Sequence, residues 1–401
     1  MPSPQHDEDK WVYPTPIEDL EAWLDGNWQW FDPLHAHRVM WPSRDYRPDM
    51  DILVAGCGTS QAAVLAYTNP AARVVGIDVS EAALDHHRRL KDRHGLGNLE
   101  VRRVPVERAA DLGEQFDLVV CTGVLDQLSD PVAGLRALAG VLRPDGVAAV
   151  MVFARYGRAG VEMMQTTFER MGLRPDEESL ETVKAAIGGL PAAHPLRGYL
   201  SIAGDVQADA GLVETFLHGR NPSHTVADCL QMTDEAGLVF QDWFLRTAYY
   251  APTLAEPGNL FYAAVKNLPD AEHWAAMERY KTANACHFFL ACRPERDRGD
   301  YRVDFGAPGA LDYVPQFRLR CGVRESEIHR PGWSLRLDPA HLALAELIDG
   351  RRSIGQIAAA VSSGGAVADG NPFELEYLAL ELFEGLWRMD FIAVAKGTPE
   401  S

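Results

Sequence analysis

Short apolar runs alternate with amphipathic stretches through the first half of the chain. Five runs have the length of buried strands, at residues 51–56, 72–80, 99–104, 116–125 and 146–154. The stretches between them show helical spacing of apolar positions at residues 60–67, 80–96 and 130–146. This alternation predicts βαβ units, and hence an α/β fold with a mostly parallel sheet covered by helices on both faces. Two later apolar runs, at residues 237–250 and 286–293, are expected to supply the last strands.

The same pattern divides the chain into five predicted parts. A charged, glycine-containing stretch at residues 293–306 is typical of a linker. Short helices and a final strand follow it, which predicts a small α+β domain that we interpret as winged-helix-like and as a protein-contact module. The predicted parts are an aromatic N-terminal cap (1–50), a core (51–159), a helical insertion (160–235), the end of the core (236–296) and a C-terminal accessory domain (297–401).

Two segments of the insertion are amphipathic. Residues 160–173 and 180–190 have apolar faces that another surface must cover. The insertion is therefore interpreted as a lid over an acceptor site or as a dimer interface. We favour the dimer interface, so we expect a homodimer.

The charge of the chain limits its partners. Among 401 residues, 38 Lys and Arg stand against 57 Asp and Glu, which gives a net charge of −19. Such a charge opposes binding to nucleic acid, because phosphate contacts need clustered cations. The same field would attract lysine-rich or arginine-rich polypeptides.

Cysteine spacing and the absence of long apolar runs bear on metal binding, disulfide bonding and membrane attachment. The 6 cysteines form no C-x-x-C pair, so the sequence predicts no metal site and no disulfide framework. The N-terminus has no apolar signal core, and no run approaches the roughly 20 apolar residues that span a membrane. We therefore expect a cytoplasmic protein without membrane attachment, and export by a route without a signal peptide stays open.

A glycine-rich turn follows the first predicted strand, in the segment DILVAGCGTSQ at residues 51–61. A dinucleotide turn reads G-x-G-x-x-G, but Gln61 stands at the third glycine position. A cofactor without phosphates needs only the tight turn and a close approach of the backbone, and S-adenosylmethionine is such a cofactor. Asp78 ends the next strand, where a carboxylate can accept both hydrogen bonds of a ribose diol. Alternatively Asp78 caps the following helix, a role that Ser80 or Glu81 could share.

Four ordered segments resemble the class I S-adenosylmethionine-dependent methyltransferases. They read AGCGTSQ, VVGIDVS, FDLVVCTGVLDQLSDP and LRPDGVAAVMVF. Tyr13-Pro14 and Trp41-Pro42 are similar to the N-terminal segment of a bacterial subgroup of that family. The resemblance implies a Rossmann-like, seven-stranded methyltransferase sheet, with S-adenosylmethionine as cofactor and S-adenosylhomocysteine as product.

The resemblance also implies cofactor-binding residues by position. The implied set is Gly56, Cys57, Gly58 and Thr59 at the methionine part, Asp78 on the ribose, Val79, Val106 and Glu107 around the adenine, and Thr122, Gly123 and Val124 near the methyl group. Two positions depart from the family pattern. Ser60 replaces the usual third glycine, which is tolerable if its φ is not positive. Val106, with Glu107 beside it, stands where many relatives have an acid near the adenine amino group.

The acceptor side is less defined. Relatives often carry histidines after "GVL", where this chain has Asp126 and Gln127. Asp126 is therefore interpreted either as an acceptor-side residue or as a solvated turn residue. The predicted catalytic candidates are Tyr13, His35, His37 and Asp126, and Trp41 and His224 are added as candidates for the acceptor pocket.

Three functions are consistent with these features. An amine acceptor must lose its proton, which burial promotes by lowering a lysine pKa, whereas a hydroxyl acceptor more often needs a positioned base. From the net negative charge and from the parts that are added to the core, we expect the methyl acceptor to be a protein, and within it a lysine nitrogen. The alternatives are a small-molecule O- or N-methyltransferase of secondary metabolism and a non-enzymatic binding protein on the same fold.

Overall fold

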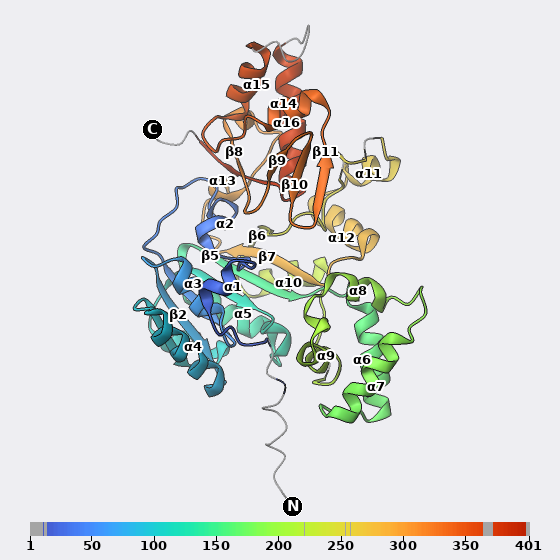
Figure 1. Ribbon diagram of the computed structural model, residues 1–401. Helices are drawn as coiled ribbons and strands as arrows, with labels where there is room; N and C mark the ends of the chain where they lie inside the picture. The colour runs from blue at the N-terminus through green and yellow to red at the C-terminus, as the bar shows by residue number, and fades with distance from the viewer. Residues whose placement is uncertain are drawn as a thin grey trace, which may run out of the picture. The chain divides into compact units, whose positions relative to one another are not determined.

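The structure, a computed structural model, describes residues 11, 14–219, 221–252, 254–256, 258–363 and 372–397. The chain divides into two compact units (Figure 1). The first unit comprises residues up to Gln29, Asp49–Phe240 and Glu278–Arg293. The second comprises Trp30–Pro48, Gln241–Met277 and residues from Pro294 onward. Both units are therefore assembled from separate stretches of the chain.

A seven-stranded sheet in the order β3-β2-β1-β4-β5-β7-β6 lies in the first unit, except for the last three residues of β6. The strands are β1 (Asp51–Ala55), β2 (Arg73–Asp78), β3 (Leu99–Arg103), β4 (Phe116–Thr122), β5 (Leu142–Phe153), β6 (Val239–Trp243) and β7 (Cys286–Cys292). Strands β3, β2, β1, β4 and β5 pair in parallel, and β7 pairs antiparallel to β5. The predicted Rossmann-like α/β sheet of seven strands is confirmed.

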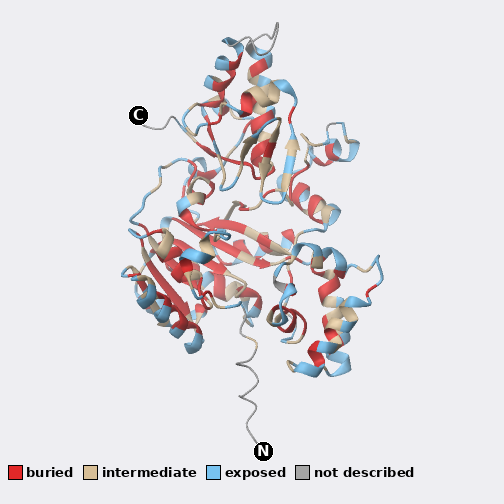
Figure 2. Ribbon diagram, viewed as in Figure 1, coloured by how far each residue is buried: buried red, intermediate tan, exposed pale blue. Residues whose placement is uncertain are grey.

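Burial explains why these segments form strands. Ile52, Leu53, Val54 and Ala55 of β1 are each 0% exposed, as expected for a parallel strand covered on both faces. Figure 2 shows the same burial along the neighbouring strands. Helices α3 and α4 pack against β2, and α5 packs against β5. The helical elements of this unit are α1 (Leu20–Leu24), α3 (Gln61–Thr68), α4 (Glu81–His94), η3 (Val106–Leu112), η4 (Leu125–Gln127), α5 (Pro131–Gly140), α6 (Ala159–Met171), α7 (Glu177–Gly188), α8 (Leu196–Ile202), η5 (Asp205–Gln207), α9 (Asp209–Phe216) and α10 (Val226–Glu235).

The helical insertion has a hydrophobic core of its own. Val161 and Phe168 of α6 pack in one cluster with Val183 of α7 and Phe216 of α9. The apolar faces of α6 and α7 thus pack within the insertion, while Met163 and Met171 of α6 stay 51% and 57% exposed. The homodimer stays a prediction.

The second unit is α+β. Strands β8 (Val314–Phe317) and β12 (Ile392–Ala395) form an antiparallel pair, and β9 (Gly322–Arg324), β10 (Glu327–Arg330) and β11 (Trp333–Arg336) form an antiparallel sheet. Its helical elements are α2 (Pro33–Met40), α11 (Leu260–Val265), the start of α12 (Asp270–Lys281), α13 (Arg298–Tyr301), η6 (Ala310–Asp312), α14 (Pro339–Ala345), α15 (Ile354–Ser363) and α16 (Pro372–Arg388). None of the helices in the described part of the chain combines the length and the hydropathy of a membrane span.

Ion pairs connect the amino ends of β1, β4 and β5. Arg143 of β5 donates to both Asp51 of β1 and Asp117 of β4, and Asp117 also accepts from the backbone N–H of Asp51. Asp117 is 2% exposed. Burial alone would raise the pKa of Asp51, but the hydrogen bonds from Arg73 and Arg143 outweigh it and hold that pKa below its usual range. The ion pairs of Asp51 therefore stabilise the folded protein fully at pH values above the pKa that Asp51 has in the unfolded chain. This stabilisation is lost as pH falls through the lower pKa that Asp51 has in the folded protein.

Replacing Arg143 by Met should destabilise the first unit. The substitution leaves the buried Asp117 carboxylate without its cation, which costs about 1–3 kcal/mol. Urea unfolding at pH 7 measures this, with Arg88→Met as the matched control, because Arg88 pairs only with exposed Glu81 and Asp85 in described contacts. The loss of unfolding free energy in Arg143→Met should become smaller as pH falls through the pKa that Asp51 has in the folded protein. Equal urea midpoints for the two variants at pH 7 would contradict this role.

Candidate functional site

The glycine turn after β1 has the backbone that its sequence predicts. Gly56 and Gly58 have φ of 68° and 55°, in the left-handed region that glycine adopts without strain. The N–H groups of Gly56 and Cys57 donate to the carbonyl oxygen of Ile77 at 2.8 and 3.0 Å. A Cβ on Gly56 would lie 2.2 Å from Val124 Cγ2, whereas a Cβ on Gly58 would meet nothing within 4 Å. The turn is therefore closed on the Val124 side and open at Gly58, where a ligand can approach the backbone.

Asp78 fastens the turn to the end of β2. One carboxylate oxygen accepts from the Gly58 N–H at 2.9 Å, and the other accepts from the Ser80 N–H at 2.9 Å. The N-cap of α4 is Ser80, whose hydroxyl accepts from Ala83 N–H, so the interpretation of Asp78 as the cap was wrong. The backbone bonds fix the position of the Asp78 carboxylate at the open side of the turn. Its remaining lone pairs suit a ribose diol.

The side chains around the turn fit a nucleoside with a thioether or sulfonium chain. Val79 is 60% exposed beside the turn, which leaves an apolar surface for the flat face of an adenine. Cys57 is buried, and burial, followed by the nearby Asp78 charge, raises the pKa of its thiol, so only its backbone can face a ligand. Ser60 has a φ of −150°, so the missing third glycine does not strain the turn. These features fit S-adenosylmethionine.

The remaining implied positions lie on the loops after β1, β3 and β4. The Thr59 hydroxyl donates to Pro14 O at 3.4 Å. Val106 is buried and Glu107 is exposed at the start of η3, so Glu107 is the polar group of the two. Gly123 has a φ of 66° after β4, next to Thr122.

Gln61 is a residue of this site that sequence reasoning treated only as a missing glycine. Its side-chain oxygen accepts from the Thr122 hydroxyl at 2.9 Å, which ties the start of α3 to the end of β4. Its amide nitrogen lies 3.4 Å from the side-chain oxygen of Gln29. A polar amide directly after the glycine turn was the available signal. Gln61 thus holds together the two loops that border the open turn.

Asp126 and His224 meet beyond the end of β4. Asp126 lies in η4 and is 1% exposed, so its interpretation as a solvated turn residue was wrong. One of its oxygens accepts from the Phe153 N–H at 3.1 Å, and the other lies 3.0 Å from His224 Nε2. The two facing atoms are not aligned for a hydrogen bond with each other or with another described group. Loose alignment of this kind is common between catalytic groups before a substrate binds.

The backbone of His224 is fixed on both sides. Its N–H donates to Phe153 O at 2.8 Å and its carbonyl accepts from Arg155 N–H at 2.8 Å, in a parallel bridge with Ala154. The same carbonyl lies 2.9 Å from His287 Nε2, and His287 in turn contacts Glu278 at 3.2 Å. These contacts fix the backbone of His224, whose imidazole Nε2 lies 3.0 Å from Asp126.

Four acceptor candidates remain besides this pair. Tyr13 lies outside the described residues. His35 and His37 are on α2 and Trp41 ends that helix, all in the second unit. Burial, with the neighbouring Arg38 charge, lowers the pKa of His37 to about 4, so its imidazole is neutral at pH 7. Their roles as catalytic residues stay predictions.

Comparison with known proteins shows which proteins the core of the chain resembles. Residues 53–148 match the family model described as a methyltransferase domain. An uncharacterized protein of Synechococcus is 30% identical over 244 residues, which is 57% of each chain. The ubiquinone biosynthesis O-methyltransferase of Acinetobacter baylyi is 31% identical over 96 residues, which is 24% of this chain and 40% of that enzyme. The chain thus spans about half the length of the curated relatives it matches.

A solved structure resembles nearly the whole chain. PKMT2 from Rickettsia typhi in complex with AdoHcy superposes with a TM-score of 0.64 over 92% of this chain and 76% of that one. The sequence identity is 16%, so this likeness shows a shared fold.

Replacing Asp78 should weaken binding of S-adenosylhomocysteine. Charge-assisted hydrogen bonds to a diol contribute about 1.5–3 kcal/mol, so Asp78→Ala should raise the Kd roughly 10- to 100-fold. Calorimetric titration measures this, with Asp85→Ala on the exposed side of α4 as control. Unchanged affinity in Asp78→Ala would exclude the ribose role.

Independent features agree on the family. The sheet has the predicted seven strands, the turn and Asp78 fit S-adenosylmethionine, and the family model covers the strands around them. Residues 53–148 therefore form a class I S-adenosylmethionine-dependent methyltransferase domain.

Proposed function

We propose that this chain methylates a protein, at the side-chain nitrogen of a lysine. The observation that carries the proposal is the extent of the likeness to PKMT2, which covers 92% of the chain and so includes residues of both units. The likeness to the ubiquinone O-methyltransferase covers only 24% of the chain. The parts outside the core are those that a large acceptor would contact.

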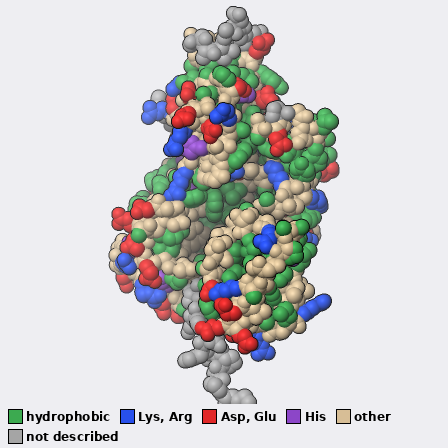
Figure 3. All heavy atoms as spheres, turned by 45° about the vertical axis from the view of Figure 1, so that its right-hand side comes forward, with side chains coloured by type: hydrophobic (Ala, Val, Ile, Leu, Met, Phe, Trp, Pro, Cys, Tyr) green, Lys and Arg blue, Asp and Glu red, His purple; other side chains and the backbone are tan. Residues whose placement is uncertain are grey.

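The charge of the chain supports a basic acceptor. A net charge of −19 attracts lysine-rich polypeptides over distances limited by the Debye length. Acidic and basic side chains are interspersed on the face drawn in Figure 3. The attraction therefore arises from the total charge and not from one acidic patch on that face. Added salt should weaken it.

The Asp126–His224 pair supplies the proton chemistry. The cofactor, when bound, supplies a methyl group on a sulfonium that needs no further activation. A lysine amine is protonated at neutral pH, with a pKa of about 10.4, and must lose that proton before it can attack. Nε2 of His224 faces Asp126, so Nδ1 is the nitrogen that can accept the proton. The Asp126 carboxylate stabilises the imidazolium that results, as in other carboxylate–histidine pairs.

A second candidate function is methylation of a small-molecule hydroxyl. The buried Asp126–His224 pair favours it as well, because a hydroxyl acceptor commonly needs a positioned base. The partial identity to an O-methyltransferase points the same way. The two candidates differ in the size of the acceptor.

A direct assay separates the two candidates. Wild-type protein and Asp78→Ala are incubated with methyl-tritiated S-adenosylmethionine, in parallel with a lysine-rich polypeptide mixture and with a set of small phenols and amines. The protein proposal expects label in polypeptide lysines that is lost in Asp78→Ala and falls as salt rises. Label in phenols and none in polypeptide would overturn it in favour of the second candidate.

Replacing His224 by Asn should lower kcat about 100-fold or more, the contribution of a general base, without changing affinity for S-adenosylhomocysteine. The variant should recover activity as pH rises toward 10, because a lysine acceptor then loses its proton without help. Asp126→Asn should behave similarly, since an amide can still accept from Phe153 N–H but cannot stabilise an imidazolium.

The matched control is His218→Asn, because His218 lies in the same unit and contacts only the Glu214 carboxylate, at 3.9 Å, among described ion pairs. A pH profile of His224→Asn parallel to that of wild type would contradict the role of His224 as a base.

A further inference from the structure

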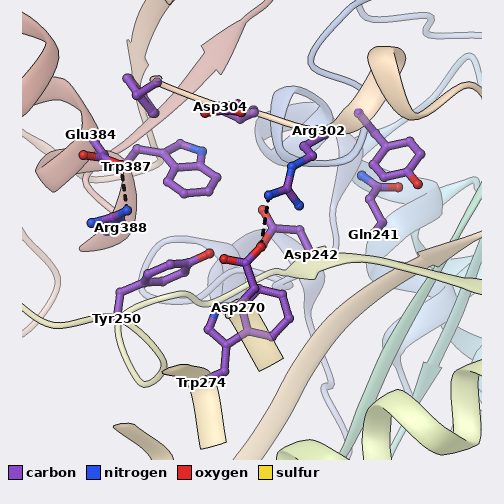
Figure 4. A pocket seen from close by; sticks show the side chains of 13 residues that line it. Gln241, Asp242, Tyr250, Asp270, Trp274, Arg302, Asp304, Glu384, Trp387 and Arg388 are labelled. Carbon is purple, nitrogen blue, oxygen red and sulfur yellow. Dashed lines mark hydrogen bonds and ion pairs between the residues drawn. The ribbon is translucent and has the colours of Figure 1, made fainter. Parts of the chain in front are cut away.

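The second unit contains a pocket of about 160 Å³. Tyr250, Trp274 and Trp387 form its aromatic wall and are 9%, 8% and 6% exposed. Asp270 and Arg302 come from α12 and from the residue after α13, and their charged groups point toward one another in Figure 4. A cavity of about 150 Å³ is large enough to bind benzene, so this pocket has room for the end of a long side chain.

The charges on the pocket favour a cation. Its lining contains the four carboxylates of Asp242, Asp270, Asp304 and Glu384 and the two guanidiniums of Arg302 and Arg388. Arg246 bonds Asp242 through Nε and Nη2 at 2.9 and 2.7 Å, which balances one further carboxylate. The lining and Arg246 together keep one negative charge in excess, and Lys396 is the cation that lies next to them, on the Arg302 carbonyl.

The two arginines of the lining are already paired. Arg388 contacts Glu384 at 2.6 Å along α16, and Arg302 contacts Asp270 at 3.0 Å. Asp304 accepts from the Gly306 N–H and interacts electrostatically with Arg302 and with Lys396, which donates to the Arg302 carbonyl at 2.8 Å. An anion entering the pocket would therefore compete with carboxylates that already bind both arginines.

Arg302 shows what kind of group the pocket accepts. Its side chain is 43% exposed and that of its partner Asp270 is 50% exposed. An ion pair this exposed contributes little to stability, so it can open at small cost. A basic side chain from another molecule could then take the place of Arg302 on Asp270, beside the aromatic wall, where a cation is favoured.

We propose that this pocket binds a lysine or arginine side chain of a polypeptide, in exchange for Arg302. The proposal rests on the proposed protein acceptor and names a second contact for it, in addition to the residue that is methylated. A free diamine would present the same chemistry, so the test includes one.

The test measures binding without S-adenosylmethionine, so it is independent of methyl transfer. Full-length protein is titrated by calorimetry with Nα-acetyl-lysine amide, Nα-acetyl-arginine amide, the uncharged Nα-acetyl-norleucine amide, the acidic Nα-acetyl-glutamate amide and cadaverine. The variants are Arg302→Met, which removes the competing cation, and Asp270→Asn, which removes the carboxylate. The matched control is Arg352→Met, which opens the exposed Arg352–Asp349 pair in the same unit.

The two variants should shift affinity in opposite directions. Arg302→Met should bind the lysine or arginine probe about two- to fivefold more tightly than wild type, the size expected for loss of an exposed ion pair. Asp270→Asn should bind it several-fold more weakly, and Arg352→Met should match wild type. A purely structural Arg302–Asp270 pair would instead leave probe affinity unchanged or lower it in both variants.

Other outcomes overturn the proposal. Equal binding of the norleucine probe would show that charge is not recognised, and tighter binding of the glutamate probe would make this an anion site. Tighter binding of cadaverine than of the lysine amide would assign the pocket to a free amine. Absence of binding to Arg302→Met at millimolar concentrations, with its thermal unfolding unchanged, would also overturn it, whatever the methyl-transfer assay shows.

Discussion

The candidate site depends on the carboxylate of Asp78. It bonds the N–H groups of Gly58 and Ser80, and so connects the turn after β1 to the start of α4. Two glycines with positive φ make that turn possible, and the bonds of Gly56 and Cys57 to Ile77 O close it. Helix α4 begins beside this carboxylate, and the dipole of a helix N-terminus attracts an anion. Without this connection the open side of the turn would have no fixed acceptor for a diol.

The parallel sheet then determines where the rest of the chemistry can lie. Parallel strands present their carboxyl ends at one edge, so the loops after β1, β2 and β4 are neighbours although the chain separates them. At that edge Gln61 bonds Thr122. His224 arrives from after the insertion and is fixed there by its parallel bridge to Ala154, at the end of β5. The opposite edge holds Arg143 with Asp51 and Asp117, and that arrangement serves stability.

The sequence predicted those parts of this arrangement that depend on a few neighbouring residues. Strand periodicity, glycine in a tight turn and an acid at the end of β2 are each visible within a few residues. The Asp126–His224 pair could not be predicted in this way, because Asp126 in its own segment resembles an ordinary turn residue. Its burial comes from Phe153 N–H and from a histidine that tertiary structure brings in. The packing of α6 and α7 within the insertion was missed for the same reason, since only the folded insertion shows that its helices pack on one another.

The group that holds each acid indicates what the acid can do. Asp78 and Asp126 are each held by backbone N–H groups, which do not leave when a ligand arrives, so these carboxylates act as fixed acceptors. Asp117 is buried and held by both a backbone N–H and Arg143, so it is inaccessible and structural. Asp270 is exposed, and its described partner is a flexible guanidinium. Of these four acids, Asp270 is therefore the one whose partner can be exchanged. A site that binds a basic side chain of another molecule requires such an exchange.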